Sequence, residues 1–139
     1  MSTSERRHIA AWLALPLLAV MNGAVRDLTY GRSMTHDAAH AVALIPLVAA
    51  IVAVSALAAR RWPLPDGRAA ARVGAAWLVL TVAFELGLGA LMQVSLREML
   101  AAYDITRGRL WLLVPFATAL APALTRAWTL RVAPKLRPA

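Results

Sequence analysis

The sequence predicts an all-α membrane protein, built as a bundle of four transmembrane helices in a single domain over residues 1–139. Of the 139 residues, 60% are hydrophobic and the mean hydropathy is +0.62, whereas a soluble domain is about 45–50% apolar. The apolar residues gather in four blocks, each close to the ~20 residues that cross a bilayer core of ~30 Å. The blocks are continuous instead of alternating, which favours helices over the strands of a membrane barrel.

The first apolar block follows a charged start, Met1–His8, and is therefore also similar to a signal peptide. A signal peptide carries a small residue three places before its cleavage site. Asn22 stands at the matching place here, and three further apolar blocks follow. We therefore expect an uncut first helix, and the four predicted spans cover residues 9–28, 38–59, 73–94 and 108–127.

Residues with special backbone chemistry indicate how these helices begin, bend and pack. Thr35 is the predicted N-cap of the second helix, with Asp37 in its first turn. Proline kinks a membrane helix, and small residues allow helices to approach closely. We expect kinks in helices one, two and four at Pro16, Pro46 and Pro115, and close packing of the third helix at Gly87, Gly89 and Ala90.

The loop between the third and fourth spans is predicted to contain a short amphipathic helix. Its apolar residues recur at i, i+3, i+4 and i+7, namely Leu96, Met99, Leu100 and Tyr103. That spacing places them on one face, as in a helix that lies on the periplasmic membrane surface. Gly108 then allows the chain to turn back into the bilayer.

The basic residues predict the orientation, because cytoplasmic loops are enriched in Arg and Lys. Ten of the fifteen lie in the two termini and the middle loop: Arg6, Arg7, Arg60, Arg61, Arg68, Arg72, Arg126, Arg131, Lys135 and Arg137. Five lie in the other two loops: Arg26, Arg32, Arg97, Arg107 and Arg109. The sequence therefore predicts a bacterial inner-membrane protein with both termini in the cytoplasm.

Composition also excludes several classes of function. The net charge is +8, but the basic residues flank the apolar blocks instead of forming one face, so the partner they indicate is the lipid bilayer and not nucleic acid. Cysteine is absent, which excludes a disulfide framework and a thiolate metal site. No phosphate loop, dinucleotide fingerprint or nucleophile–base pattern is present, and we predict no cofactor.

Glu85 is the most informative residue, because it lies within the third apolar block. A carboxyl group there costs a few kcal/mol unless it faces the bundle interior and is protonated or paired. The outer half of the predicted bundle brings polar side chains to it from all four helices, whereas the inner half holds almost none. These candidate residues are Asn22, Arg26, His40, Gln93 and Arg109.

Two interpretations of this asymmetry stay open. Glu85 is either part of a structural network, neutralised by Arg26 or Arg109 and hydrogen-bonded by Asn22, or the floor of a polar pocket that opens to the periplasm. His36 and His40 are four residues apart and also fit a metal on one helix face. No third or fourth ligand accompanies them, so we predict no metal site and a titrating histidine instead.

Three stretches together define a pattern: Asn22–Asp27 (NGAVRD), Phe84–Gly89 (FELGLG) and Tyr103–Trp111 (YDITRGRLW). This pattern resembles a family of small, uncharacterised four-helix bacterial inner-membrane proteins. The resemblance implies the same topology, and it adds Asp104 to the residues of interest. The chain departs from the family at Ala90, where a polar residue, often His, is expected.

These observations predict a small membrane protein that handles an ion, a proton or a small solute through the pocket around Glu85. Four helices barely enclose a continuous path, so an oligomer is expected. The alternative is a non-catalytic accessory or assembly subunit of a larger membrane complex. The third hypothesis is a membrane enzyme that acts on a lipidic substrate, with Glu85 and Asp104 as acid and base.

Overall fold

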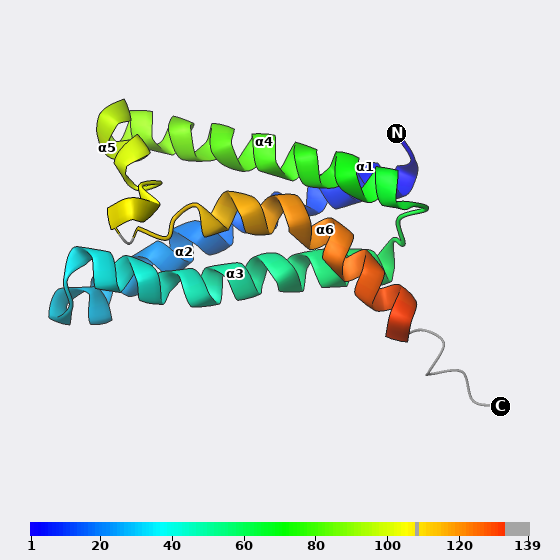
Figure 1. Cartoon of the computed structure of the whole chain (residues 1–139), viewed down its shortest axis with the longest axis horizontal. Helices are drawn as coiled ribbons and strands as arrows, with labels where there is room; N and C mark the ends of the chain where they lie inside the picture. The colour runs from blue at the N-terminus through cyan, green and yellow to red at the C-terminus, as the bar shows by residue number, and fades with distance from the viewer. Residues whose placement is uncertain (108, 133–139) are drawn as a thin grey trace.

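The protein is all-α in the computed structural model, which describes residues 1–107 and 109–132 (Figure 1). Four long stretches of helix run side by side among the described residues. At one end, short helical turns connect the first stretch to the second and the third to the fourth. The α-helices are α1 (Thr3–Ala11), α2 (Ala14–Leu28), α3 (His36–Arg61), α4 (Gly67–Leu91), α5 (Leu96–Ala101) and α6 (Leu113–Val132); the 3₁₀ turns are η1 (Tyr30–Ser33) and η2 (Ile105–Arg107).

Among the residues that the structure describes, three helical segments are long and apolar enough to cross a membrane: Thr3–Leu28, which joins α1 and α2, then α3 and α4. Their outer faces carry large exposed apolar side chains, among them Leu13, Ile45 and Val79. Such surfaces are stable against lipid and aggregate in water. The three segments therefore indicate a multi-pass membrane protein.

The predicted fourth span differs from the helix observed there. α6 begins at Leu113, so the prediction of a helix from residue 108 is wrong for Arg109–Leu112, while Gly108 lies outside the described residues. Pro115 stands in the first turn of α6, where a missing N–H is tolerated, instead of kinking the helix. α6 has 20 residues, which corresponds to about 30 Å of helix, but it is not among the segments apolar enough to span by composition.

Pro16 breaks the first helix, as predicted. A proline has no N–H to donate to the carbonyl four residues back. The N–H groups of Trp12 and Leu13 bond three residues back to Ile9 and Ala10, and Leu15 donates to Trp12 at 2.8 Å. The tighter turns separate α1 from α2. By contrast, α3 continues through Pro46.

α4 and α6 approach each other closely at a residue that the sequence analysis did not select. A Cβ on Gly74 would fall against the backbone carbonyl of Ala119, so only glycine fits there. The predicted packing role of Gly87 is wrong, because a Cβ there would meet no atom within 4 Å. Gly89 is in close contact, but with the side chain of Met99 in α5 instead of a long helix.

A tryptophan, Trp77, lies fully buried in the interior of the bundle. Trp77 and Ile51 are the largest fully buried apolar side chains, at 0% and 1% exposure. The indole of Trp77 donates to the carbonyl of His8 at 2.9 Å. In an unbroken helix the N–H of Trp12 would donate to the carbonyl of His8, but here it donates to the carbonyl of Ile9. Trp77 therefore satisfies a group that the break leaves without its helical partner.

The first turn of α1, the α3–α4 turn and the last turn of α6 lie at one end of the bundle (Figure 1). Polar contacts join them: Arg126 donates to the carbonyls of Leu64 and Pro65 at 3.2 and 3.0 Å. Glu5, with 2% of its side chain exposed, pairs with Arg72 at 2.7 Å. An ion pair and two carbonyl contacts thus hold the helix ends together here.

Candidate functional site

A cavity of about 410 Å³ lies between α2 and α4, near the other end of the bundle. α2 packs mainly on α3, and α4 packs mainly on α6, so the space between α2 and α4 is not filled by direct contact. Most of the lining is apolar, and the polar exceptions are Arg26, Asp27, Thr81, Glu85 and Thr118. Val20 and Met92 line it while 52% and 67% exposed, which makes it a groove that opens on the side of the bundle.

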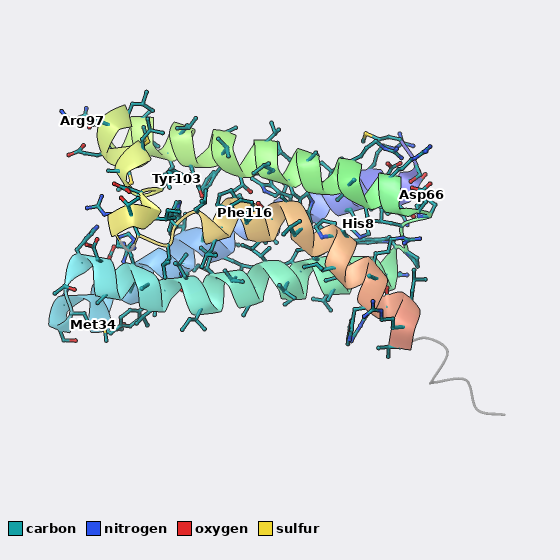
Figure 2. The ribbon with its side chains drawn as sticks, in the orientation of Figure 1. His8, Met34, Asp66, Arg97, Tyr103 and Phe116 are labelled. Carbon is teal, nitrogen blue, oxygen red and sulfur yellow. The ribbon has the colours of Figure 1, made fainter. Side chains whose placement is uncertain are left out.

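Glu85 lines this groove from the second half of α4 and is half-buried. The hydroxyl of Tyr103 donates to its Oε2 atom, and the side chain of Trp111 interacts with the same carboxyl group. Figure 2 shows Tyr103 at the α5 end of the molecule, opposite His8 and Asp66. Burial and the neighbouring Glu85 raise the pKa of Tyr103 above its ordinary value, so it stays a hydrogen-bond donor to the carboxylate.

α5 brings Tyr103 to this position. Ser95 caps α5 by accepting from the Glu98 N–H, and the Ser95 N–H donates to the Glu98 carboxylate at 3.0 Å, which is a capping box. Hydrogen bonds from the Ser95 hydroxyl and N–H lower the pKa of Glu98. The predicted short helix is thus present. Its apolar residues differ in their surroundings, because Met99 packs on Gly89, whereas Leu96 and Leu100 are exposed.

Arg26 does not neutralise Glu85, so this part of the predicted structural network is wrong. Its Nε and Nη2 atoms bind the two carboxylate oxygens of Asp27 at 2.7 and 3.1 Å. Its Nη1 atom lies 3.1 Å from the ring of His40. The carboxylate of Asp27, the next residue in the chain, thus binds the guanidinium in a bidentate pair. Arg26 and Glu85 nevertheless line the same groove.

Asn22 and Arg109 also have other partners than Glu85. Asn22 donates to the carbonyl of Ala43 at 2.9 Å, which joins α2 to α3. Arg109 donates to the carbonyl of Ala101 at 3.0 Å and lies 3.6 Å from Asp37. Both residues hold connections between helices, and neither lines the groove.

Gln93 is exposed, and its predicted place on the helical face of Glu85 is wrong. Its φ is 58°, and it ends α4: Gln93 donates to Ala90 at 3.1 Å and Val94 donates to Gly89 at 2.9 Å. These two bonds form a Schellman motif, in which the left-handed residue is usually glycine. Gln93 therefore turns the chain into α5 instead of extending the site.

Asp104 lies in the connection after Tyr103 and does not line the groove. Its Oδ1 atom accepts from the N–H and hydroxyl of Thr106 at 3.1 and 2.5 Å, which is an Asx-type turn. Glu85 and Asp104 thus do not face one cavity, and the geometry gives no support to the acid–base pair of the enzyme hypothesis.

The rings of His36 and His40 lie 4.3 Å apart, as their spacing predicts. His40 also lies edge-on to Trp111, with ring centroids 6.2 Å apart. Thr35 caps α3 through the N–H of Ala38 at 3.4 Å, which confirms the predicted start of that helix. Within residues 1–107 and 109–132, no three His, Asp or Glu side chains group to hold a metal ion.

The sequence analysis missed the aromatic residues that line the groove together with Glu85. Trp12, Phe84 and Trp111 line the groove, Trp12 donates to Thr81 at 2.9 Å, and Trp12 and Phe84 meet edge to face at 6.4 Å. Two signals for them were present in the sequence: Tyr103 is the last residue on the apolar face of the predicted short helix, and Trp111 belongs to the pattern that carries the resemblance.

No family model, curated protein or solved structure matches the chain.

Proposed function

We propose that this chain is a small inner-membrane protein that handles an ion, a proton or a small solute in a periplasm-facing pocket around Glu85. The observation that carries the proposal is that Glu85 and the Arg26–Asp27 pair line one cavity of about 410 Å³. That volume lies within the ~300–1,000 Å³ of small-ligand sites. Asp27, at the end of α2, lines the cavity while 64% of its side chain is exposed, which supports an opening at that end.

The topology included in this proposal has four spans with both termini in the cytoplasm, α6 being the fourth. The excess of basic residues at the α1 and α3–α4 end supports that orientation. The groove opens on one side of the bundle, because exposed residues of α2 and α4 line it. A homo-oligomer would close this side, and we include it in the proposal.

Single-cysteine variants test the pocket, since the native chain has no cysteine. Ala19→Cys places a thiol in the groove wall, whereas Ala43→Cys places one in a buried site outside it. A small membrane-impermeant methanethiosulfonate reagent is added to spheroplasts. We expect Ala19→Cys to react from outside and Ala43→Cys to remain unmodified.

Two exposed positions calibrate the orientation in the same experiment. Ser33→Cys should react in intact spheroplasts, and Arg61→Cys should react only after permeabilisation. If Ala19→Cys reacts only after permeabilisation, or not at all while Ser33→Cys reacts, the periplasm-facing pocket is refuted.

A further inference from the structure

The groove has an unusual combination of walls and charge. It follows α2 from Leu15 to Asp27, which are 12 helical steps or about 18 Å apart, and most of that length is apolar. Trp12, Phe84 and Trp111 contribute aromatic rings. A site for a small inorganic cation has a different composition, since such ions take several oxygen ligands at once.

The charges of the groove do not cancel when Glu85 is ionised. Arg26 and Asp27 neutralise each other, and each of the three guanidinium nitrogens of Arg26 already makes a hydrogen bond. The Asp27 carboxylate thus compensates the charge of Arg26, which leaves the Glu85 carboxylate as the uncompensated charge of the groove. Glu85 accepts a hydrogen bond from Tyr103, but a carboxylate has about four acceptor sites, so it retains capacity for a ligand.

We infer that the ligand of this groove is a lipophilic organic cation, whose charge pairs with the Glu85 carboxylate and whose apolar groups contact Trp12, Phe84 and Trp111. This inference rests on the proposed pocket and names its substrate class. A cation compensates a carboxylate held among apolar walls, where an anion would be repelled and a neutral molecule would leave the charge unpaired. Aromatic side chains add cation–π attraction.

A pair of probes with the same shape and opposite charge tests the inference. Tetraphenylphosphonium and tetraphenylborate are titrated separately against the purified full-length protein in nanodiscs of neutral lipid, and bound probe is measured by equilibrium dialysis against empty nanodiscs. We expect saturable binding of the phosphonium cation and no comparable binding of the borate anion. Equal affinity for both ions, or binding of neither, overturns the inference.

Carboxyl variants locate the charge that selects the cation. Glu85→Gln should weaken phosphonium binding by about tenfold or more, whereas Glu85→Asp, which keeps the charge, should retain most of it. Glu98→Gln is the matched control and should leave binding unchanged, because Glu98 lies outside the groove and glutamine also fits its position in the capping box of α5. Circular dichroism verifies that each variant is folded. Unchanged binding in folded Glu85→Gln overturns the inference.

The two phenylalanines provide a matched aromatic test. Phe84 lines the groove, whereas Phe116 does not and is exposed; Figure 2 labels Phe116 on α6. Phe84→Leu should weaken phosphonium binding about two- to fivefold, and Phe116→Leu should not.

If Ala19→Cys reacts from outside but the cation shows no advantage over the anion, the pocket stands and only the ligand class fails. If Ala19→Cys is unreactive, the proposed pocket itself fails.

Discussion

The contact between Gly74 and Ala119 predicts a large difference between two substitutions that are identical in chemistry. In Gly74→Ala the new Cβ would lie against the carbonyl oxygen of Ala119 and 3.1 Å from its carbonyl carbon. Backbone atoms of α6 cannot turn aside as a side chain can, so α4 and α6 must separate. Overpacking of this kind costs about 1–3 kcal/mol.

Gly87→Ala is the internal control, because Gly87 stands in the same helix and a Cβ there meets nothing within 4 Å. Both substitutions receive the same helix-propensity gain of about 0.5–1 kcal/mol, which cancels in the comparison. The free energy of unfolding, measured by circular dichroism during detergent-induced unfolding in mixed micelles, should therefore differ by about 1–3 kcal/mol. Equal stability of the two variants would refute the close α4–α6 approach.

Three further predictions concern single residues. Gln93→Gly should leave stability unchanged or raise it by about 1 kcal/mol, since glycine adopts the φ of 58° without strain; a clear loss in the same unfolding assay contradicts the Schellman geometry. Trp77→Phe should lose about 1–3 kcal/mol or more, because it leaves the carbonyl of His8 unpaired, and a neutral result contradicts that role. The raised pKa of Tyr103 means that the folded state holds the phenol proton more tightly than the unfolded chain. Stability should therefore fall as the pH rises above about 10, and Tyr103→Phe should remove that part of the fall.

The apolar segments and several helix ends were predictable from the sequence because they depend on local chemistry. Hydropathy over about 20 residues identifies a helix that crosses lipid, and Thr35 caps α3 through an N–H only three residues away. The break at Pro16 also follows from a missing backbone donor. The start of the last helix was not predictable in this way, because Arg109 bonds to Ala101 and approaches Asp37 in a distant helix.

The site illustrates the same division. Arg26 lies near the C-terminal end of α2, as predicted, yet its guanidinium binds Asp27 and His40 instead of Glu85. At 3.6 residues per turn, a small rotation of a helix changes which side chain faces which neighbour, and depth along the bilayer does not determine that rotation. Distance estimates from helix ends therefore placed Arg26 and Glu85 at depths that let them line one groove, but they did not identify the hydrogen-bond partner of either residue.

By itself, the sequence determined that this chain is helical and apolar enough for lipid, and that a carboxyl group lies within its third apolar block. Those properties follow from residue types and their spacing along the chain. Only the tertiary structure decided that Tyr103 bonds to that carboxyl group, that Gly74 meets Ala119, and that aromatic residues share its groove. The physical reason is that these contacts join helices far apart in the chain, and packing of whole helix faces sets them.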